Sequence, residues 1–280
     1  MLTGILLTLA AAACFECSYV LQTLEVRAVA TMERASVQAL RGLAARPLWL
    51  ASIALSLAGF ALEVLALRRI PLTLAQPLLA TGLLGLLGFS ATVLGERVGR
   101  REVGAVAAIV AGVALIALAD PRRGHGTAPG AAFVAVAIAL GIVSLSAFVA
   151  PRSGSGLLLA AAIAADALAA LAAAQAARTL PELLSTAGWC LLAAGGGIAA
   201  VAAESAVLQR RGAARVAPVV LAGQVAVPVA LAPLVIGEHW NGAGIVLGGL
   251  ALVIAGSALL ASSAGVGGLA LHQPEHEVGS

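Results

Sequence analysis

Nine apolar stretches, each long enough to cross a membrane, constrain this chain more than any other feature of its sequence. About 20 apolar residues in a helix span the hydrocarbon core of a bilayer, which is about 30 Å thick. Helices are expected because lipid cannot satisfy an open sheet edge, and because barrel strands would alternate in polarity. The sequence therefore predicts an all-α, polytopic membrane bundle. The stretches are 2–22, 48–67, 71–95, 103–119, 130–150, 156–177, 187–208, 213–236 and 243–261.

The composition agrees with this reading and argues against a soluble or nucleic-acid-binding protein. Of 280 residues, 61% are hydrophobic and only 10% are charged, whereas ordinary globular chains carry about 25% charged residues. All sixteen basic residues are Arg, and they lie between the apolar stretches as topology determinants do. The Ala-rich, Lys-free composition is typical of a GC-rich bacterial genome. We therefore expect a multi-pass protein of the bacterial cytoplasmic (inner) membrane, with lipid as a partner and no nucleic acid.

The first apolar stretch contains Glu16 and a C-x-x-C pattern made by Cys14 and Cys17. It has no basic n-region, so we expect a retained helix and not a cleaved signal peptide. The second Cys pair of a closed zinc site is missing, and Cys190 lies alone in another apolar stretch. We therefore expect small apolar side chains here, with no metal and no cofactor.

Two segments of the chain carry the same features in the same order, which indicates a duplication. Glu63, an Arg pair and Pro77 in the first segment match Glu204, an Arg pair and Pro218 in the second. In both, the following apolar helix ends in Gly-Glu, at residues 95–96 and 237–238. We therefore predict a first repeat at 1–120, a second repeat at 121–262 and a disordered cytoplasmic tail at 263–280.

The distribution of Arg predicts the orientation of the repeats. Loops at 23–46, 96–102, 151–155 and 209–215 share eleven Arg, and the loops on the other side share five. The Arg-rich side is expected to be cytoplasmic. The helix that ends near Arg68 then leaves on the outer side and its counterpart near Arg210 on the inner side, so the repeats are inverted, as in many transporters.

Residues 23–46 are too charged for an ordinary span. An amphipathic or re-entrant segment is the preferred interpretation, and a tenth spanning helix is the alternative. The tail contains His272 and His276, for which metal binding is an alternative to simple disorder.

These features resemble the drug/metabolite transporter (EamA-like) superfamily. The residues that carry the resemblance are Arg68-Arg69-Ile70-Pro71-Leu72 through Gln76-Pro77, then Leu94-Gly95-Glu96-Arg97, Arg101-Glu102-Val103-Gly104, and the looser Gly237-Glu238. Within the superfamily the layout is similar to NIPA-type magnesium transporters and to uncharacterised actinobacterial membrane proteins, although the magnesium transporters have Asn where this chain has Glu63. The resemblance implies a transporter built from inverted repeats.

Four ionisable side chains fall inside apolar stretches: Glu16, Glu63, Asp166 and Glu204. Such groups are costly in a membrane and are functional candidates by default. Small multidrug transporters also carry a Glu in their first helix, where it binds substrate cation and proton in competition. The alternative for each residue is an ion pair or a hydrogen bond that holds helices together. Glu96 and Glu238 are expected at helix ends that water reaches.

Prolines within the predicted helices could break the helical hydrogen bonding next to a central site. Pro77, Pro218, Pro228 and Pro233 each remove a backbone hydrogen bond. Gln76, Thr81 and Gln224 lie nearby and could line a cavity between the repeats. The alternative is that proline is simply common in membrane helices.

Small residues recur at every fourth position in two of the predicted helices, which favours close helix packing. They are Gly104, Ala108 and Gly112 in one helix and Gly244 and Gly248 in the other. Packing within one chain is preferred over a homodimer interface.

No nucleotide-binding or hydrolytic motif is present, so we expect no enzymatic activity. The expected function is secondary transport of a small metabolite or organic cation, coupled to protons through Glu16, Glu63 and Glu204. A magnesium-type cation transporter and a non-transporting membrane scaffold remain as alternatives.

Overall fold

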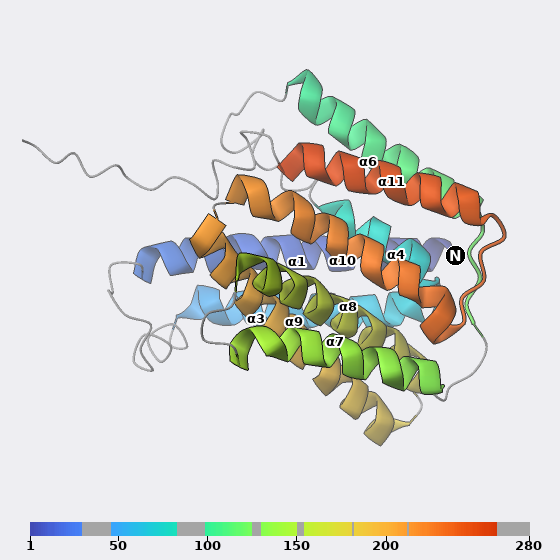
Figure 1. Ribbon diagram of the computed structural model, residues 1–280, viewed down its shortest axis with the longest axis horizontal. Coiled ribbons are helices and arrows are strands. Elements are labelled where there is room, and N and C mark those ends of the chain that lie inside the picture. The colour runs from blue at the N-terminus through green and yellow to red at the C-terminus, as the bar shows by residue number, and fades with distance from the viewer. Residues whose placement is uncertain are drawn as a thin grey trace, which may run out of the picture.

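The computed structural model describes residues 1–29, 46–82, 99–124, 130–149, 154–180, 182–211 and 213–261. These residues form nine α-helices, and the β-type pairing among them is limited to an isolated bridge between Arg122 and His239. The helices are α1 (Leu2–Val29), α3 (Pro47–Leu67), α4 (Leu72–Ala80), α6 (Arg100–Leu118), α7 (Ala131–Val149), α8 (Ser155–Thr179), α9 (Leu183–Arg211), α10 (Ala213–Ile236) and α11 (Ala243–Ala261). The predicted all-α class is confirmed for this part of the chain (Figure 1).

Most helix boundaries follow the apolar stretches closely. α10 and α11 have the predicted bounds, but α1 continues to Val29, seven residues beyond its apolar stretch. No Gly or Pro interrupts residues 21–29, so the helix has no local reason to stop. Residues 30–45, the second half of the stretch 71–95 and the tail from 262 lie outside the described residues. The amphipathic segment and the disordered tail therefore stay predictions.

Five helices contain segments long and apolar enough to cross a bilayer: Pro47–Leu67, Arg100–Leu118, Gly156–Thr179, Leu183–Glu204 and Val219–Ile236. Shorter apolar segments lie in α1, α7 and α11. Large apolar side chains such as Leu118, Leu191 and Ile198 are 73–77% exposed. Large apolar side chains are exposed on each of these five helices, whereas soluble proteins rarely expose large apolar patches. The chain is therefore a helical membrane protein whose outer surface suits lipid.

α8 is the central helix of the bundle and packs against α3, α7, α9 and α10. Its Ala-rich sequence lets neighbours approach closely. A Cβ added at Gly196 of α9 would lie 2.9 Å from the carbonyl oxygen of Ala165, so the two backbones nearly touch there. The core around α8 includes Leu171 from α8 itself and Phe133 from α7, whose ring meets Trp189 edge to face at 5.3 Å.

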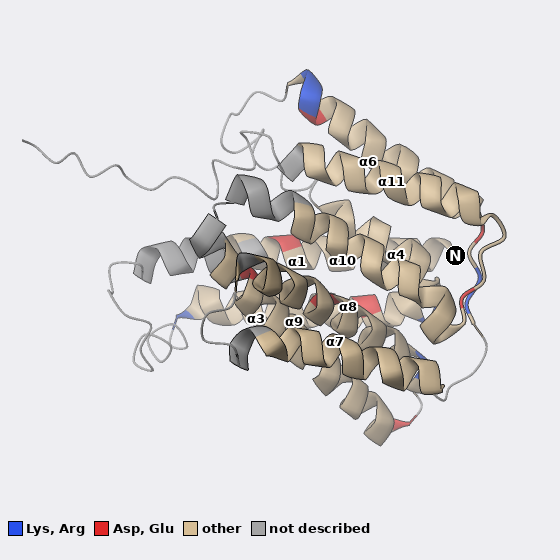
Figure 2. Cartoon of the chain, viewed as in Figure 1, with Lys and Arg blue, Asp and Glu red and all other residues tan. Residues whose placement is uncertain are grey.

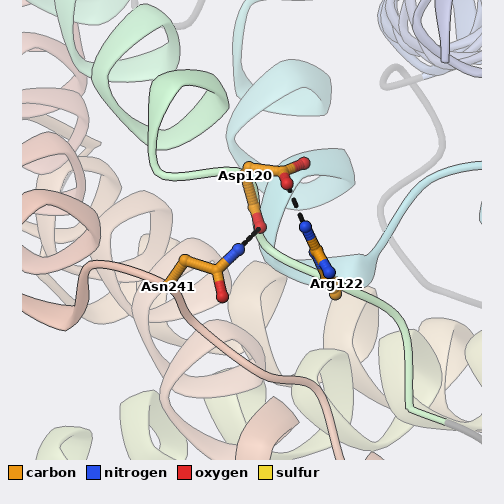
Figure 3. Close-up of polar contacts among 3 residues, drawn as sticks. All are labelled: Asp120, Arg122 and Asn241. Atoms are coloured by element: carbon orange, nitrogen blue, oxygen red, sulfur yellow. Dashed lines mark hydrogen bonds and ion pairs between the residues drawn. The ribbon is translucent and has the colours of Figure 1, made fainter.

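Loops that are distant in sequence meet at one end of the bundle, which we call the clasped end and define by residues 68–73, 120–124 and 236–241. The backbones of Arg122 and His239 pair through two hydrogen bonds of 2.8 and 3.0 Å. Close by, the Asn241 amide donates to the Asp120 carbonyl oxygen at 3.2 Å, and Arg122 forms an ion pair with Asp120 at 3.3 Å (Figure 3).

Several helices begin or end at the clasped end. α3, α6, α8 and α10 end there, while α4, α9 and α11 begin there. Gly4, near the start of α1, also packs against Ile70 at this end. The arrangement places together the loops that the Arg distribution assigned to one side of the membrane. Figure 2 shows basic residues at helix ends and loops, and acidic residues also within the bundle.

Candidate functional site

Three acidic side chains from three different helices form a row inside the bundle. Glu63 lies one turn before the end of α3, Asp166 near the middle of α8, and Glu204 in the second half of α9. The carboxyl group of Asp166 interacts electrostatically with Glu63 and also with Glu204. Asp166 is therefore the middle member of the row, which we call the carboxyl row.

Helix direction favours the approach of Glu63 and Glu204 to Asp166. A side chain on an α-helix tilts toward the N-terminus of that helix. α3 ends at the clasped end, so Glu63 leans away from that end and into the bundle. α9 begins at the clasped end, so Glu204, near its far end, leans back toward the middle. Along the bundle, Asp166 lies between the two, because it is further than Glu63 and nearer than Glu204 to the clasped end.

The carboxyl row lies in apolar surroundings. Glu63 is only 7% exposed, and Asp166 and Glu204 are partly buried. Among the described side chains, the structure shows an ion pair between Arg122 and Asp120, which lies in the loops of the clasped end. The expected alternative, an Arg ion pair with Glu63, is therefore not seen in this part of the chain. Such acidic groups within membrane helices are typical of ion or substrate pathways.

Glu16 is not part of the carboxyl row and packs elsewhere in the bundle. Its side chain is partly buried and lies against Gly82, where an added Cβ would be 2.9 Å from both its Cγ and its Oε1. α1 is held to α3 nearby by Ser18, whose hydroxyl is 2.8 Å from the Ser52 carbonyl oxygen and 2.6 Å from the Ser56 hydroxyl. Glu16 thus borders α1 and the residues after α4.

The other predicted site residues lie on α4 and α10, which contact each other. Gln76 and Pro77 are buried in α4, Pro228 is buried in α10, and Gln224 is partly buried there. Pro218 lies within α10, but its side chain is outside the described part of the structure. The structure therefore brings the two proline-bearing helices together, while a shared cavity lined by Gln76 and Gln224 stays a prediction.

The three cysteines are free, and Cys17 is exposed. In the described residues, His, Cys, Asp and Glu form no group of three with a metal-binding arrangement. The carboxyl row is thus a chain of pairwise neighbours and not a compact cage.

The expectation that water reaches Glu238 is wrong, because the structure buries this residue at 4% exposure. Gly237 adopts a left-handed conformation with φ of 64°, which ends α10 and turns the chain back. The Glu238 carboxylate then accepts hydrogen bonds from the backbone N–H groups of Leu72 and Thr73, at 2.5 and 3.0 Å, and from the Thr73 hydroxyl at 2.6 Å. Glu238 therefore caps the N-terminus of α4.

Two charged groups at the clasped end have perturbed pKa values. Burial raises the pKa of Glu238, and this effect outweighs its hydrogen bonds with Thr73 and Leu72 and the positive charge of Arg178, which lower it. Burial lowers the pKa of Arg123, the negative charge of Glu238 raises it and Arg68 lowers it. The clasped end is thus a partly desolvated charged cluster.

Gln175 on α8 was not among the residues predicted for the site. It is 2% exposed, and its Oε1 atom has no hydrogen-bond partner among the described residues. Its only sequence signal is a single amide in an Ala-rich helix. Glu238 had a clearer signal, because its Gly-Glu pair recurs in the other half of the chain.

The fold and the carboxyl row together define a class: a polytopic helical membrane protein with acidic side chains inside its bundle. Comparison with known proteins does not narrow this class. No protein-family model, no curated protein and no solved structure matches the chain significantly.

Proposed function

We propose that this protein is a secondary membrane transporter, a permease without enzymatic activity, in a bacterial cytoplasmic membrane. It moves a small metabolite or organic cation by alternating access and couples this movement to protons. The drug/metabolite transporter resemblance of the sequence favours the same function. Substrate and proton would bind at the carboxyl row, with Glu16 as a further candidate.

The observation that carries the proposal is the carboxyl row itself. Glu63, Asp166 and Glu204 come from three helices, and Asp166 is near enough to both glutamates to interact with them electrostatically. A helix bundle that served only as a scaffold would be more stable with apolar residues at these positions. Carboxyl groups that exchange a proton for a cation give such costly residues a function.

The proposed inverted repeat supports alternating access. An offset of 141 residues separates Glu63 from Glu204, Pro77 from Pro218, and the start of α4 from the start of α10. The members of each proposed helix pair, α3 with α9, α4 with α10 and α6 with α11, run in opposite directions relative to the clasped end. Inverted halves of this kind form the central sites of many secondary transporters.

Purified protein in liposomes that contain a pH-sensitive dye tests the proposal. A panel of organic cations, amino acids and other small metabolites is added in turn, with magnesium as a separate arm. At least one organic solute should change the internal pH, and Asp166→Asn should reduce this response by about 100-fold, as for loss of an essential proton-transfer group. Glu182→Gln, an exposed carboxylate outside the row, is the matched control.

The outcomes separate the proposed function from its alternatives. Movement of magnesium alone, without proton movement, would favour a divalent-cation transporter. No response to any solute, with the row variants as stable as the wild type, would favour a membrane scaffold.

A further inference from the structure

Glu238 links two parts of the chain that are far apart in sequence. Its three hydrogen bonds reach Leu72 and Thr73, about 165 residues away, and the indole N–H of Trp240 donates to the Thr73 hydroxyl at 3.0 Å. The loop 237–241 therefore holds the first turn of α4 through two side chains.

The position of this contact decides what it can control. α4 is a short helix that carries buried Gln76 and Pro77, and its N-terminus lies at the clasped end. Three further contacts cross the same end: Arg178 donates to the carbonyl oxygen of Ile236 at 2.7 Å, Arg123 donates to that of Arg68, and the backbones of residues 122 and 239 pair. Together these contacts join the loops at this end of the bundle.

The chemistry of the Glu238 contact suits repeated opening and closing. The first N–H groups of a helix have no partner within the helix, and they attract a negative charge. When such a contact opens, water can hydrate both the carboxylate and the freed N–H groups. Apolar contacts have no such compensation in water. The contact is therefore specific in the closed state, and hydrogen bonds to water replace it in the open state.

We propose that the loop 237–241 is the gate of the clasped end, and that Glu238 is the positioning residue that holds the N-terminus of α4 in the closed state. This inference rests on the proposed transport function, because alternating access requires this end to open. Arg123 and Arg178 are the charged groups that face Glu238 from the neighbouring elements. Their positive charges favour the closed position of its carboxylate.

Thiol labelling in detergent tests the gate without any transport measurement. Leu74, 1% exposed and just inside the gate on α4, is replaced by Cys in a background where Cys14, Cys17 and Cys190 are Ala. With wild-type Glu238, a hydrophilic thiol reagent should react slowly with this Cys. In Glu238→Ala the rate should rise about tenfold or more, because the closed state loses hydrogen bonds to a charged group.

Two further variants keep the test decisive if Glu238→Ala does not fold. Trp240→Phe keeps an aromatic ring but lacks the N–H that reaches Thr73, and Thr73→Val replaces the hydroxyl with a methyl group. Each should raise the labelling rate less than Glu238→Ala, because the bonds from the backbone N–H groups to Glu238 remain. Glu182→Gln, an exposed carboxylate at the start of α9, should leave the rate unchanged.

The labelling and transport measurements can fail separately. Equal labelling rates in wild type and in all folded gate variants would overturn the gate, even if transport occurs. Faster labelling in a protein that moves no solute would support opening at the loop 237–241 and would contradict the proposed transport function.

Discussion

At the scale of single residues, opposing effects act on the pKa of the Glu238 carboxyl group. Burial raises its pKa, and the hydrogen bonds from Thr73 and Leu72 lower it less strongly. The folded protein therefore binds this proton more tightly than the unfolded chain does. A protonated carboxyl group still has oxygen lone pairs that accept hydrogen bonds, so the cap on α4 can persist.

The resulting prediction concerns stability against pH. Because the pKa of Glu238 is raised in the folded state, its proton-linked contribution to stability is fully present in acid and is lost as pH rises through the raised pKa. Thermal unfolding in detergent at about pH 5 and about pH 8 measures this contribution. The increase in melting temperature from the higher to the lower pH should be larger for the wild type than for Glu238→Ala. Equal pH dependence of the two proteins would contradict the raised pKa.

Single residues also show where sequence reasoning was sufficient and where it was not. The cost of a charge in lipid singled out Glu63, Asp166 and Glu204 individually. Their arrangement in a row depends on which helices are neighbours, and no local pattern specifies that. Glu238 was misjudged because its place at a helix end suggested contact with water, whereas the fold of distant loops buries it.

At the scale of helices, the pair α6 and α11 packs through glycines at the edge of the bundle (Figure 1). A Cβ at Gly112 would lie 2.5 Å from the carbonyl oxygen of Gly249, whereas one at Gly104 would meet nothing within 4 Å. Of the predicted small-residue positions, Gly112 therefore packs within the chain. Gly104, Gly244 and Gly248 face open space, and a homodimer through them stays a prediction.

Two substitutions in α6 should therefore have opposite effects on stability. Ala is favoured over Gly inside a helix by about 1 kcal/mol, so Gly104→Ala should be neutral or stabilising. Gly112→Ala should be destabilising by about 1–3 kcal/mol, because the added methyl group meets backbone that cannot move aside. Melting temperatures in detergent compare the two variants. A Gly112→Ala protein as stable as Gly104→Ala would contradict the close packing of α6 and α11.

Helix boundaries were the easiest feature to predict, for a physical reason. α10 and α11 match their apolar stretches because polar residues flank both stretches in the sequence. α1 extends further because helix formation depends on backbone hydrogen bonds, and these continue into the charged residues after Gln22. Composition indicates which residues lie in lipid, but a helix can continue beyond those residues.

At the scale of the whole molecule, the clasped end predicts a topology. Arg122 and Asn241 lie at this end, and Arg100 begins α6 at the opposite end. In a background without the three native cysteines, Arg122→Cys and Asn241→Cys should react with an impermeant reagent from the same side of the membrane. Arg100→Cys should react from the other side, which the Arg distribution assigns to the cytoplasm. Labelling of all three from one side would contradict the arrangement of helices.

The proposed function requires that energy stored in a pH gradient moves a solute through the carboxyl row. The row lies between the clasped end and the far end of α9, so protons from either side could reach a member of it as the halves move. Asp166 should matter most, because it is the neighbour of both Glu63 and Glu204. Glu16, which packs against Gly82, provides a comparison outside the row.

The most direct test is solute accumulation in liposomes with an imposed pH gradient, for a solute identified by the panel. The wild-type protein should accumulate this solute while the gradient lasts and lose the excess when an ionophore collapses it. Glu63→Gln, Asp166→Asn and Glu204→Gln should each abolish the gradient-driven part. If the gradient has no effect and all three variants transport like the wild type, the proton-coupled mechanism is wrong.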